Sequence, residues 1–115
     1  MHKKFEVRLL EEAFDFIKSQ DAKVQDKIFY NIRKAQLQNN PRLFKKLNQN
    51  FWEFRTKYTG LQYRILAFWD KENNEMTLVC GAYGFIKKTD KVSPREIEKA
   101  EQIRIAYFER KKEGR

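Results

Sequence analysis

Read with a period of two, residues 50–88 predict three consecutive β-strands, of which the first alternates between apolar and polar residues and the other two are rich in apolar strand formers. Two short segments, Tyr58-Thr59-Gly60 and Lys71-Glu72-Asn73-Asn74, follow the first and second strands and are typical of hairpin connections. The predicted strands are Phe51–Lys57, Tyr63–Asp70 and Met76–Gly84, after which the basic segment 85–88 leaves the sheet. Because strands joined by short loops pair in opposite directions, we expect an antiparallel meander.

Charged residues interrupt the apolar pattern of the first two strands. A period of two places Trp52 and Phe54 on one face of the first strand, and Glu53 and Arg55 on the other. The middle strand is apolar on both faces except at Arg64. Arg64 is therefore a candidate phosphate-binding residue, and a cross-strand ion pair with Glu53 is the structural alternative.

Further elements are predicted on both sides of the meander. They are a strand (Lys4–Leu10), two amphipathic helices (Glu11–Ser19 and Ala22–Gln38), a link (Arg42–Asn50), a closing helix (Pro94 to about Lys111) and a frayed charged tail (Arg110–Arg115). Ser93, Pro94 and Glu96 have the signature of a helix start, as N-cap, first-turn proline and second half of a capping box. We expect an α+β fold: an antiparallel sheet, made of the short N-terminal strand and the three-strand meander, packed by the N-terminal helical hairpin, with a C-terminal helix.

Composition narrows the class of protein. A length of 115 residues fits one domain, spanning residues 1–115. The 25 basic residues outnumber the 16 acidic ones, and the resulting net charge of +9 favours a polyanionic partner, either nucleic acid or an acidic protein. No segment has the length of a membrane span, and the charged start is unlike a secretory signal, so we expect a cytoplasmic protein with no membrane partner.

Residues that hold metals or form covalent bonds are scarce. The chain has one histidine, His2, and one cysteine, Cys80, so neither a zinc ligand set nor a disulfide framework is expected. Cys80 lies among apolar strand residues and is expected to be a small buried hydrophobe. Gly81 and Gly84 do not belong to a phosphate loop. We therefore expect no metal and no cofactor.

Cations are concentrated around the meander. Between Arg42 and Arg64 the only acidic residue is Glu53. The basic residues concerned are Arg42, Lys45, Lys46, Arg55, Lys57 and Arg64, followed after the last strand by Lys87, Lys88 and Lys91. If the strands pair as predicted, these cations converge at one end of one face, as phosphate binding requires. Tyr58, Tyr63 and Tyr83 could stack bases beside them, although tyrosines more often fill a core and exposed lysines often have no ligand.

Several motifs follow one another in a characteristic order. They are Lys46-Leu47, Phe51-Trp52-Glu53-Phe54-Arg55, Gly60, Tyr63-Arg64-Ile65-Leu66, Gly84-Phe85-Ile86-Lys87-Lys88 and Ser93-Pro94-Arg95-Glu96-Ile97. At this spacing the sequence resembles the RelE/HigB/ParE superfamily of toxins from type II toxin–antitoxin systems, nearest the phage-derived HigB-like branch. The resemblance covers essentially the whole chain and implies a RelE-like fold.

The resemblance also implies an activity: metal-independent, ribosome-dependent cleavage of mRNA. In that reaction the 2′-hydroxyl attacks the adjacent phosphate and leaves a 2′,3′-cyclic phosphate and a 5′-hydroxyl, which requires a base, an acid and cations around the phosphorane. By resemblance Arg55 replaces a catalytic lysine, Arg64 is the phosphate-binding arginine, and Lys87 and Lys88 lie near a basic residue that stabilises the transition state. Glu53 could act as a base or could orient Arg64.

Other residues are expected to contribute to RNA binding. These are Lys45, Lys46, Lys57, Tyr83 and Lys91. The C-terminal tyrosine and the histidines that other members of the superfamily use have no clear counterpart, and Tyr83 and Tyr107 are the nearest candidates. The implied partners are the ribosome with its mRNA and a cognate antitoxin, which is usually a helix-turn-helix protein. The alternatives are a ParE-like gyrase inhibitor, whose subfamily tends to lack the cationic cluster, and a non-catalytic phage-derived binding module.

Overall fold

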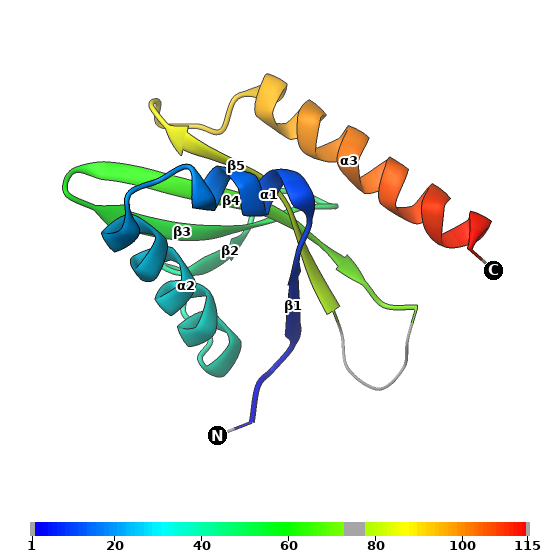
Figure 1. The fold of residues 1–115 in the computed structure, drawn as a ribbon, viewed down its shortest axis with the longest axis horizontal. Helices are drawn as coiled ribbons and strands as arrows, with labels where there is room; N and C mark the ends of the chain where they lie inside the picture. Colours follow the sequence, from blue (N-terminus) through cyan, green and yellow to red (C-terminus); the bar gives the residue numbers. More distant parts are fainter. Residues whose placement is uncertain (1, 73–77, 115) are drawn as a thin grey trace.

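The computed structural model describes residues 2–72 and 78–114, which form an α+β fold (Figure 1). Its elements are β1 (Glu6–Leu9), α1 (Glu11–Lys18), α2 (Ala22–Leu37), β2 (Phe44–Lys46), β3 (Trp52–Tyr58), β4 (Leu61–Asp70), β5 (Leu78–Lys87) and α3 (Pro94–Glu113). Within these residues the strands form one sheet in the order β1-β5-β4-β3-β2. The predicted meander corresponds to β3, β4 and β5, which pair antiparallel as expected.

The complete sheet is mixed, which corrects the expectation of a purely antiparallel one. The N-terminal strand β1 pairs parallel with β5, with Glu6 opposite Leu78. A further strand, β2, pairs antiparallel with β3 inside the segment that was predicted to be only a link. Periodicity within a strand carries no information on the direction of its neighbour, and three residues are too few for a period to be recognised.

The strand β5 also differs from the prediction. It extends through Lys87 instead of ending before Phe85, and its register against β4 shifts between Leu66 and Ala67. Leu66 lies opposite Tyr83 while Ala67 lies opposite Gly81, so one residue of β5 has no partner on β4 and a β-bulge results. The predicted start of this strand at residues 76–77 and the loop residues 73–74 lie outside the described residues.

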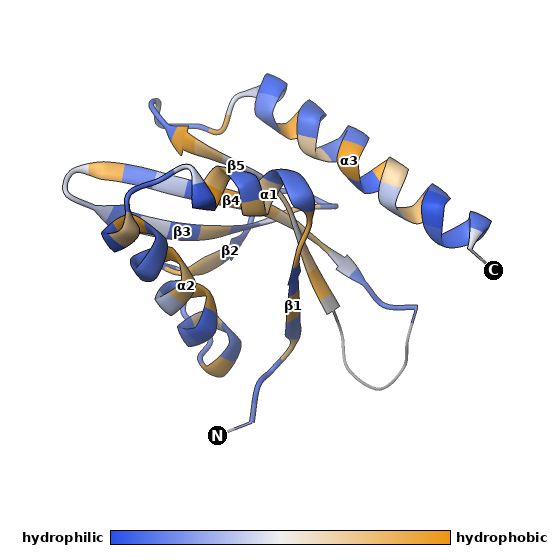
Figure 2. Cartoon of the chain, viewed as in Figure 1, coloured by the Kyte–Doolittle hydropathy of each residue, from blue (hydrophilic) through white to orange (hydrophobic). Residues whose placement is uncertain are grey.

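Helices cover both faces of the sheet, so the molecule has two apolar cores. The helices α1 and α2 lie over one face, where Ile17, Ile28 and Ile32 pack on Phe54 and Ile65 (Figure 1). Figure 2 shows that the apolar residues of α2 face the sheet while its polar residues face solvent. The second core lies between α3 and the other face, and its buried residues are Phe51, Leu66, Phe68, Cys80, Ala82, Ala100 and Tyr107.

The closing helix is fixed at both ends. At its start the Oγ of Ser93 accepts a hydrogen bond from the Glu96 N–H at 3.3 Å, with Pro94 in the first turn, which confirms the predicted N-cap. At its end Lys111 contacts Asp70, with 2.7 Å between Nζ and Oδ2, and α3 extends to Glu113, two residues beyond the predicted end near Lys111. In residues 2–72 and 78–114, no helix combines the length and the apolar character needed to cross a membrane.

Candidate functional site

The register of β3, β4 and β5 collects the predicted charged residues on the sheet face that carries α3. Arg55 lies directly opposite Arg64, which in turn lies opposite Phe85. The next row on the same face, toward the β3–β4 hairpin, contains Lys57, Gln62 and Lys87. The next row on this face in the opposite direction contains Lys45, Glu53, Leu66 and Tyr83. Directly opposed residues point to the same side of a sheet, so the side chains of Glu53, Arg55, Lys57, Arg64 and Lys87 share this face, which we call the site face.

Glu53 joins the two arginines of the site face. Its carboxylate is buried, and Oε1 lies 3.3 Å from the Nε of Arg55 and 3.7 Å from the Nε of Arg64. Two arginines placed directly opposite each other would repel, and the carboxylate between them offsets this repulsion. Its second oxygen, Oε2, is buried and has no hydrogen-bond partner among the described residues.

Arg64 is held inside the protein. Its side chain is 4 % exposed, Nη2 donates to the Oε1 of Gln62 at 2.5 Å, and Nη1 donates to the Tyr63 carbonyl at 3.5 Å. Burial lowers the pKa of the Arg64 guanidinium, the Glu53 carboxylate opposes this decrease, and Arg55 adds to it. The contacts of Arg64 are thus those of the ion-pair alternative, and its positive charge lies just beneath the surface.

Arg55 is the arginine that solvent reaches. Its side chain is 27 % exposed, against 4 % for Arg64. The Nη1 of Arg55 donates to the Pro41 carbonyl at 3.2 Å, which together with the contact to Glu53 orients the guanidinium along the edge of the site face. A guanidinium that is oriented and partly exposed is suited to bind a phosphate through two parallel hydrogen bonds.

Three of the predicted lysines meet at the end of β5. Lys87, Lys88 and Lys91 line one depression together with Phe85 and Glu96. Lys87 therefore belongs both to this depression and to the site face, where it lies in the row next to that of Arg55 and Arg64. The depression extends the positive charge of the site face toward the loop before α3.

The remaining predicted RNA-binding residues are divided between the two faces of the sheet. Lys45 and Tyr83 are in the row of Glu53 on the site face. Lys46 lies opposite Trp52, which places it on the face that carries α2. Tyr83 stacks on Phe85 with 6.2 Å between ring centroids, whereas the other two tyrosines considered for base stacking, Tyr58 and Tyr63, pack with the α1/α2 core.

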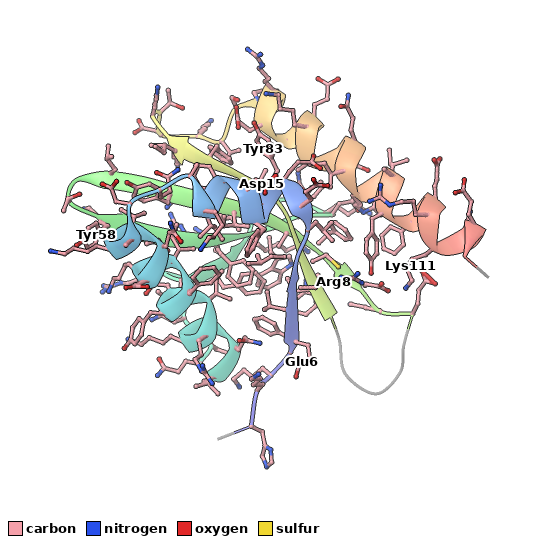
Figure 3. The ribbon with its side chains drawn as sticks, viewed as in Figure 1. Glu6, Arg8, Asp15, Tyr58, Tyr83 and Lys111 are labelled. Atoms are coloured by element: carbon pink, nitrogen blue, oxygen red, sulfur yellow. The ribbon has the colours of Figure 1, made fainter. Side chains whose placement is uncertain are left out.

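The second tyrosine considered as an acid or base, Tyr107, lies far from these residues. Its hydroxyl donates to the Oδ2 of Asp70 at 2.5 Å, at the opposite end of β4 from Arg64. Figure 3 shows this separation through its labels: Lys111, whose side chain also contacts Asp70, and Tyr58 lie at opposite ends of the sheet. Burial, followed by the hydrogen bond to Asp70, raises the pKa of Tyr107, so it does not ionise near neutral pH.

Two residues near the site were not singled out by the sequence reasoning. Gln62 accepts the short hydrogen bond from Arg64, and its position two residues before Arg64 on the same strand face was the available signal. Glu96 was assigned only to helix capping, yet its Oε2 is buried beside the lysine depression and has no hydrogen-bond partner within residues 2–72 and 78–114.

Other kinds of chemistry have little support at this site. Cys80 is fully buried, as predicted, and burial raises the pKa of its thiol, which disfavours the reactive thiolate. In the part of the chain that the structure describes, no three His, Cys, Asp or Glu residues are grouped to hold a metal ion. The site face is instead a set of cations arranged around one carboxylate.

Comparison with known families gives one match. The model of a family described as phage derived protein Gp49-like (DUF891) matches residues 15–105. This span contains most of the chain, including all of β2 to β5 and therefore every residue of the site face. No curated protein and no solved structure gives a significant match.

Proposed function

Because the chain belongs to the phage-derived Gp49-like family, we propose that it is the toxin of a type II toxin–antitoxin system and that it cleaves mRNA on the ribosome without a metal. A Gp49-like chain fits a toxin–antitoxin context because this is a RelE-like toxin family. The observation that carries the nuclease proposal is the ion-paired group of Arg55, Glu53 and Arg64 on adjacent strands, with Lys87 in the next row.

The proposed chemistry is stabilisation of negative charge on a phosphate. During attack by a 2′-hydroxyl, the phosphorane gains charge that preorganised cations stabilise more strongly than they stabilise the ground state. Arg55, which is partly exposed and oriented by two contacts, binds the scissile phosphate. Lys87 neutralises an adjacent phosphate, and Lys88 and Lys91 extend the binding surface along the RNA.

Arg64 and Glu53 act on this phosphate through Arg55. The buried guanidinium of Arg64 contributes positive potential from below, and it fixes the Glu53 carboxylate that in turn holds Arg55. Because the buried Glu53 side chain contacts the guanidinium groups of both Arg55 and Arg64, we assign it an orienting role instead of that of general base.

The proposed partners follow from the same face. The ribosome presents the mRNA, and an antitoxin with a helix-turn-helix domain neutralises the toxin by covering the cations of the site face. Tyr83, Phe85 and Lys99 border this face on the α3 side, with the Lys99 Nζ 3.3 Å from the Tyr83 hydroxyl. An acidic segment of the antitoxin would compete there with RNA phosphates for the same cations.

The proposal is tested by comparing Arg55→Ala with Arg8→Ala in cleavage of mRNA on translating ribosomes. Arg8 is an exposed arginine on β1, away from the site (Figure 3). Because both residues are arginines, the two substitutions change the net charge by the same amount. Loss of a cation that stabilises the transition state costs about 3 kcal/mol, so we expect cleavage by Arg55→Ala to be about 100-fold slower. The Arg8→Ala variant should cleave at the wild-type rate.

Three results would contradict the proposal. One is equal cleavage by Arg55→Ala and wild type, and another is equal cleavage of naked and ribosome-bound RNA. The third is a primary effect of the purified protein on DNA supercoiling with no RNA cleavage, which would support a gyrase inhibitor instead.

A further inference from the structure

A stripe of basic residues and one aromatic residue runs along the solvent side of α2. Lys23, Lys27, Tyr30 and Lys34 follow one another at intervals of three or four residues, which places them on one side of a helix. Tyr30 is 57 % exposed, the highest value among the exposed large hydrophobic side chains of residues 2–72 and 78–114. The stripe lies on the other side of the sheet from the site face.

Two lysines are directed at the ring of Tyr30. The Nζ of Lys27 lies 5.3 Å from the ring centroid, and the Nζ of Lys34 lies 6.0 Å from it. Neither lysine forms an ion pair with a carboxylate in the part of the chain that the structure describes. The ring is thus flanked by cations that are available to a ligand.

The stripe is continuous with the end of the sheet that carries the candidate site. A shallow depression beside Tyr30 is also lined by Lys23, Asp26 and Tyr58. Tyr58 ends β3, and its neighbour Lys57 points to the site face, so the tip of the β3–β4 hairpin joins the two surfaces. In Figure 3 the labelled Tyr58 lies at this hairpin tip, close to α2.

We propose that the α2 stripe is a second contact surface for single-stranded RNA, with one base stacked on Tyr30 and its flanking phosphates bound by Lys27 and Lys34. The inference extends the proposed function by giving the RNA a path from the site face around the hairpin tip. Stacking on an exposed ring with neighbouring cations is the usual way to bind single strands without reading their sequence.

An RNA fits this surface better than a protein partner does. Protein interfaces have an apolar centre in which lysine is depleted, whereas the residues around Tyr30 are mainly lysines. Nucleic acid instead supplies a flat base and a phosphate at every repeat, which match a ring between two cations. Asp26 is the one acidic residue that lines the depression, and it should oppose binding.

The test measures binding of a fluorescent 2′-O-methyl oligoribonucleotide to the full chain by anisotropy at low salt. Its blocked 2′-oxygen prevents cleavage, so binding is measured independently of catalysis. We expect Tyr30→Ala to weaken binding about tenfold and Tyr30→Phe to have an effect of less than about twofold, because phenylalanine keeps the stacking surface. The Asp26→Asn variant should bind more tightly than wild type.

A matched pair of double variants separates this surface from net charge. Lys27→Gln/Lys34→Gln should lower the slope of log affinity against log salt by about one to two units. Lys18→Gln/Lys112→Gln removes two exposed lysines elsewhere and should leave the slope unchanged. Equal effects of the two double variants, or wild-type affinity of Tyr30→Ala, would overturn the inference.

Polyglutamate, which is anionic but has no bases, distinguishes an acidic protein partner from RNA. If Tyr30→Ala weakens the binding of polyglutamate as much as that of the oligonucleotide, the stripe is a site for acidic protein and the RNA inference is wrong. Cleavage-deficient Arg55→Ala should still lose affinity when Tyr30→Ala is added, which tests the stripe even if the nuclease proposal fails.

Discussion

At the scale of single residues, Arg55 and Arg64 have the same charge but different tasks. Arg64 is buried and is the counter-ion of a buried carboxylate, whereas Arg55 is partly exposed. Removing Arg64 leaves Glu53 buried with fewer partners, and losing one member of a buried pair costs about 3–5 kcal/mol. We therefore expect Arg64→Ala to lower the free energy of unfolding by about 3 kcal/mol in urea titrations, and Arg55→Ala to lower it by less than about 1 kcal/mol.

This expectation can be checked with a variant that keeps the charge. Arg64→Lys retains a cation near Glu53 but loses the planar group that reaches both Gln62 and the Tyr63 carbonyl. Its stability should lie between those of wild type and Arg64→Ala. Wild-type stability of Arg64→Ala would show that the ion pair with Glu53 contributes little, and that Arg64 serves RNA alone.

Glu53 provides the second prediction at this scale. The glutamine in Glu53→Gln keeps an oxygen that can accept from Arg55 or Arg64, so the arginines should remain close to their positions. If Glu53 orients the cations, Glu53→Gln should retain cleavage on ribosomes within about tenfold of wild type, far above Arg55→Ala. A folded Glu53→Gln protein that binds ribosomes but cleaves at the level of Arg55→Ala would identify Glu53 as the general base.

At the scale of elements, the attachment of α3 depends on Asp70. Burial alone would raise the pKa of Asp70, but hydrogen bonds from Lys111, Tyr107 and the Glu72 N–H outweigh burial and lower it. A lowered pKa in the folded state means that the stabilisation is present above the unfolded pKa, about 3.9, and is lost as the pH falls through the folded value. The end of α3 should therefore detach in acid.

We expect this effect in urea titrations between pH 7 and pH 3. Asp70→Asn should be less stable than wild type at pH 7, and the difference should shrink as the pH falls below the unfolded pKa, because the stabilisation from ionised Asp70 is then progressively lost. Asp15→Asn, which changes an exposed carboxylate on α1, is the matched control and should show no such convergence. A difference between Asp70→Asn and wild type that stays constant with pH would show that the anchor does not depend on the charge of Asp70.

At the scale of the whole molecule, the sheet separates two helical layers, and cations lie on both sides of it. If Arg55, Lys57 and Lys87 neutralise three phosphates of the single-stranded mRNA, affinity for ribosomes that carry mRNA should fall on the order of 20-fold between 50 and 200 mM salt. Filter-binding measurements should show that Lys57→Gln reduces the salt slope by about one unit, since it removes one phosphate contact. An affinity that does not change with salt would mean that the net charge of +9 has no part in binding.

The sequence by itself determined the local features of this protein. Alternation in β3 and runs of apolar strand formers in β4 and β5 predicted these strands, and a period of two placed Glu53 and Arg55 together on one side of β3. Ser93 and Pro94 predicted the start of α3, because capping depends on residues that are neighbours in the chain. These features follow from backbone geometry over a few residues, so a single sequence is sufficient to find them.

Only the tertiary structure decided how these elements combine. The parallel pairing of β1 with β5, the bulge opposite Leu66 and Ala67, and the bond between Asp70 and Lys111 join residues far apart in the chain. The role of Arg64 was likewise open in the sequence, which allowed both a phosphate ligand and an ion pair, and burial beside Glu53 gave it the contacts of the ion pair. Strand direction, register and burial depend on which strand or helix each element packs against. The periodicity of one strand is a property of that strand alone, so it does not specify this neighbour.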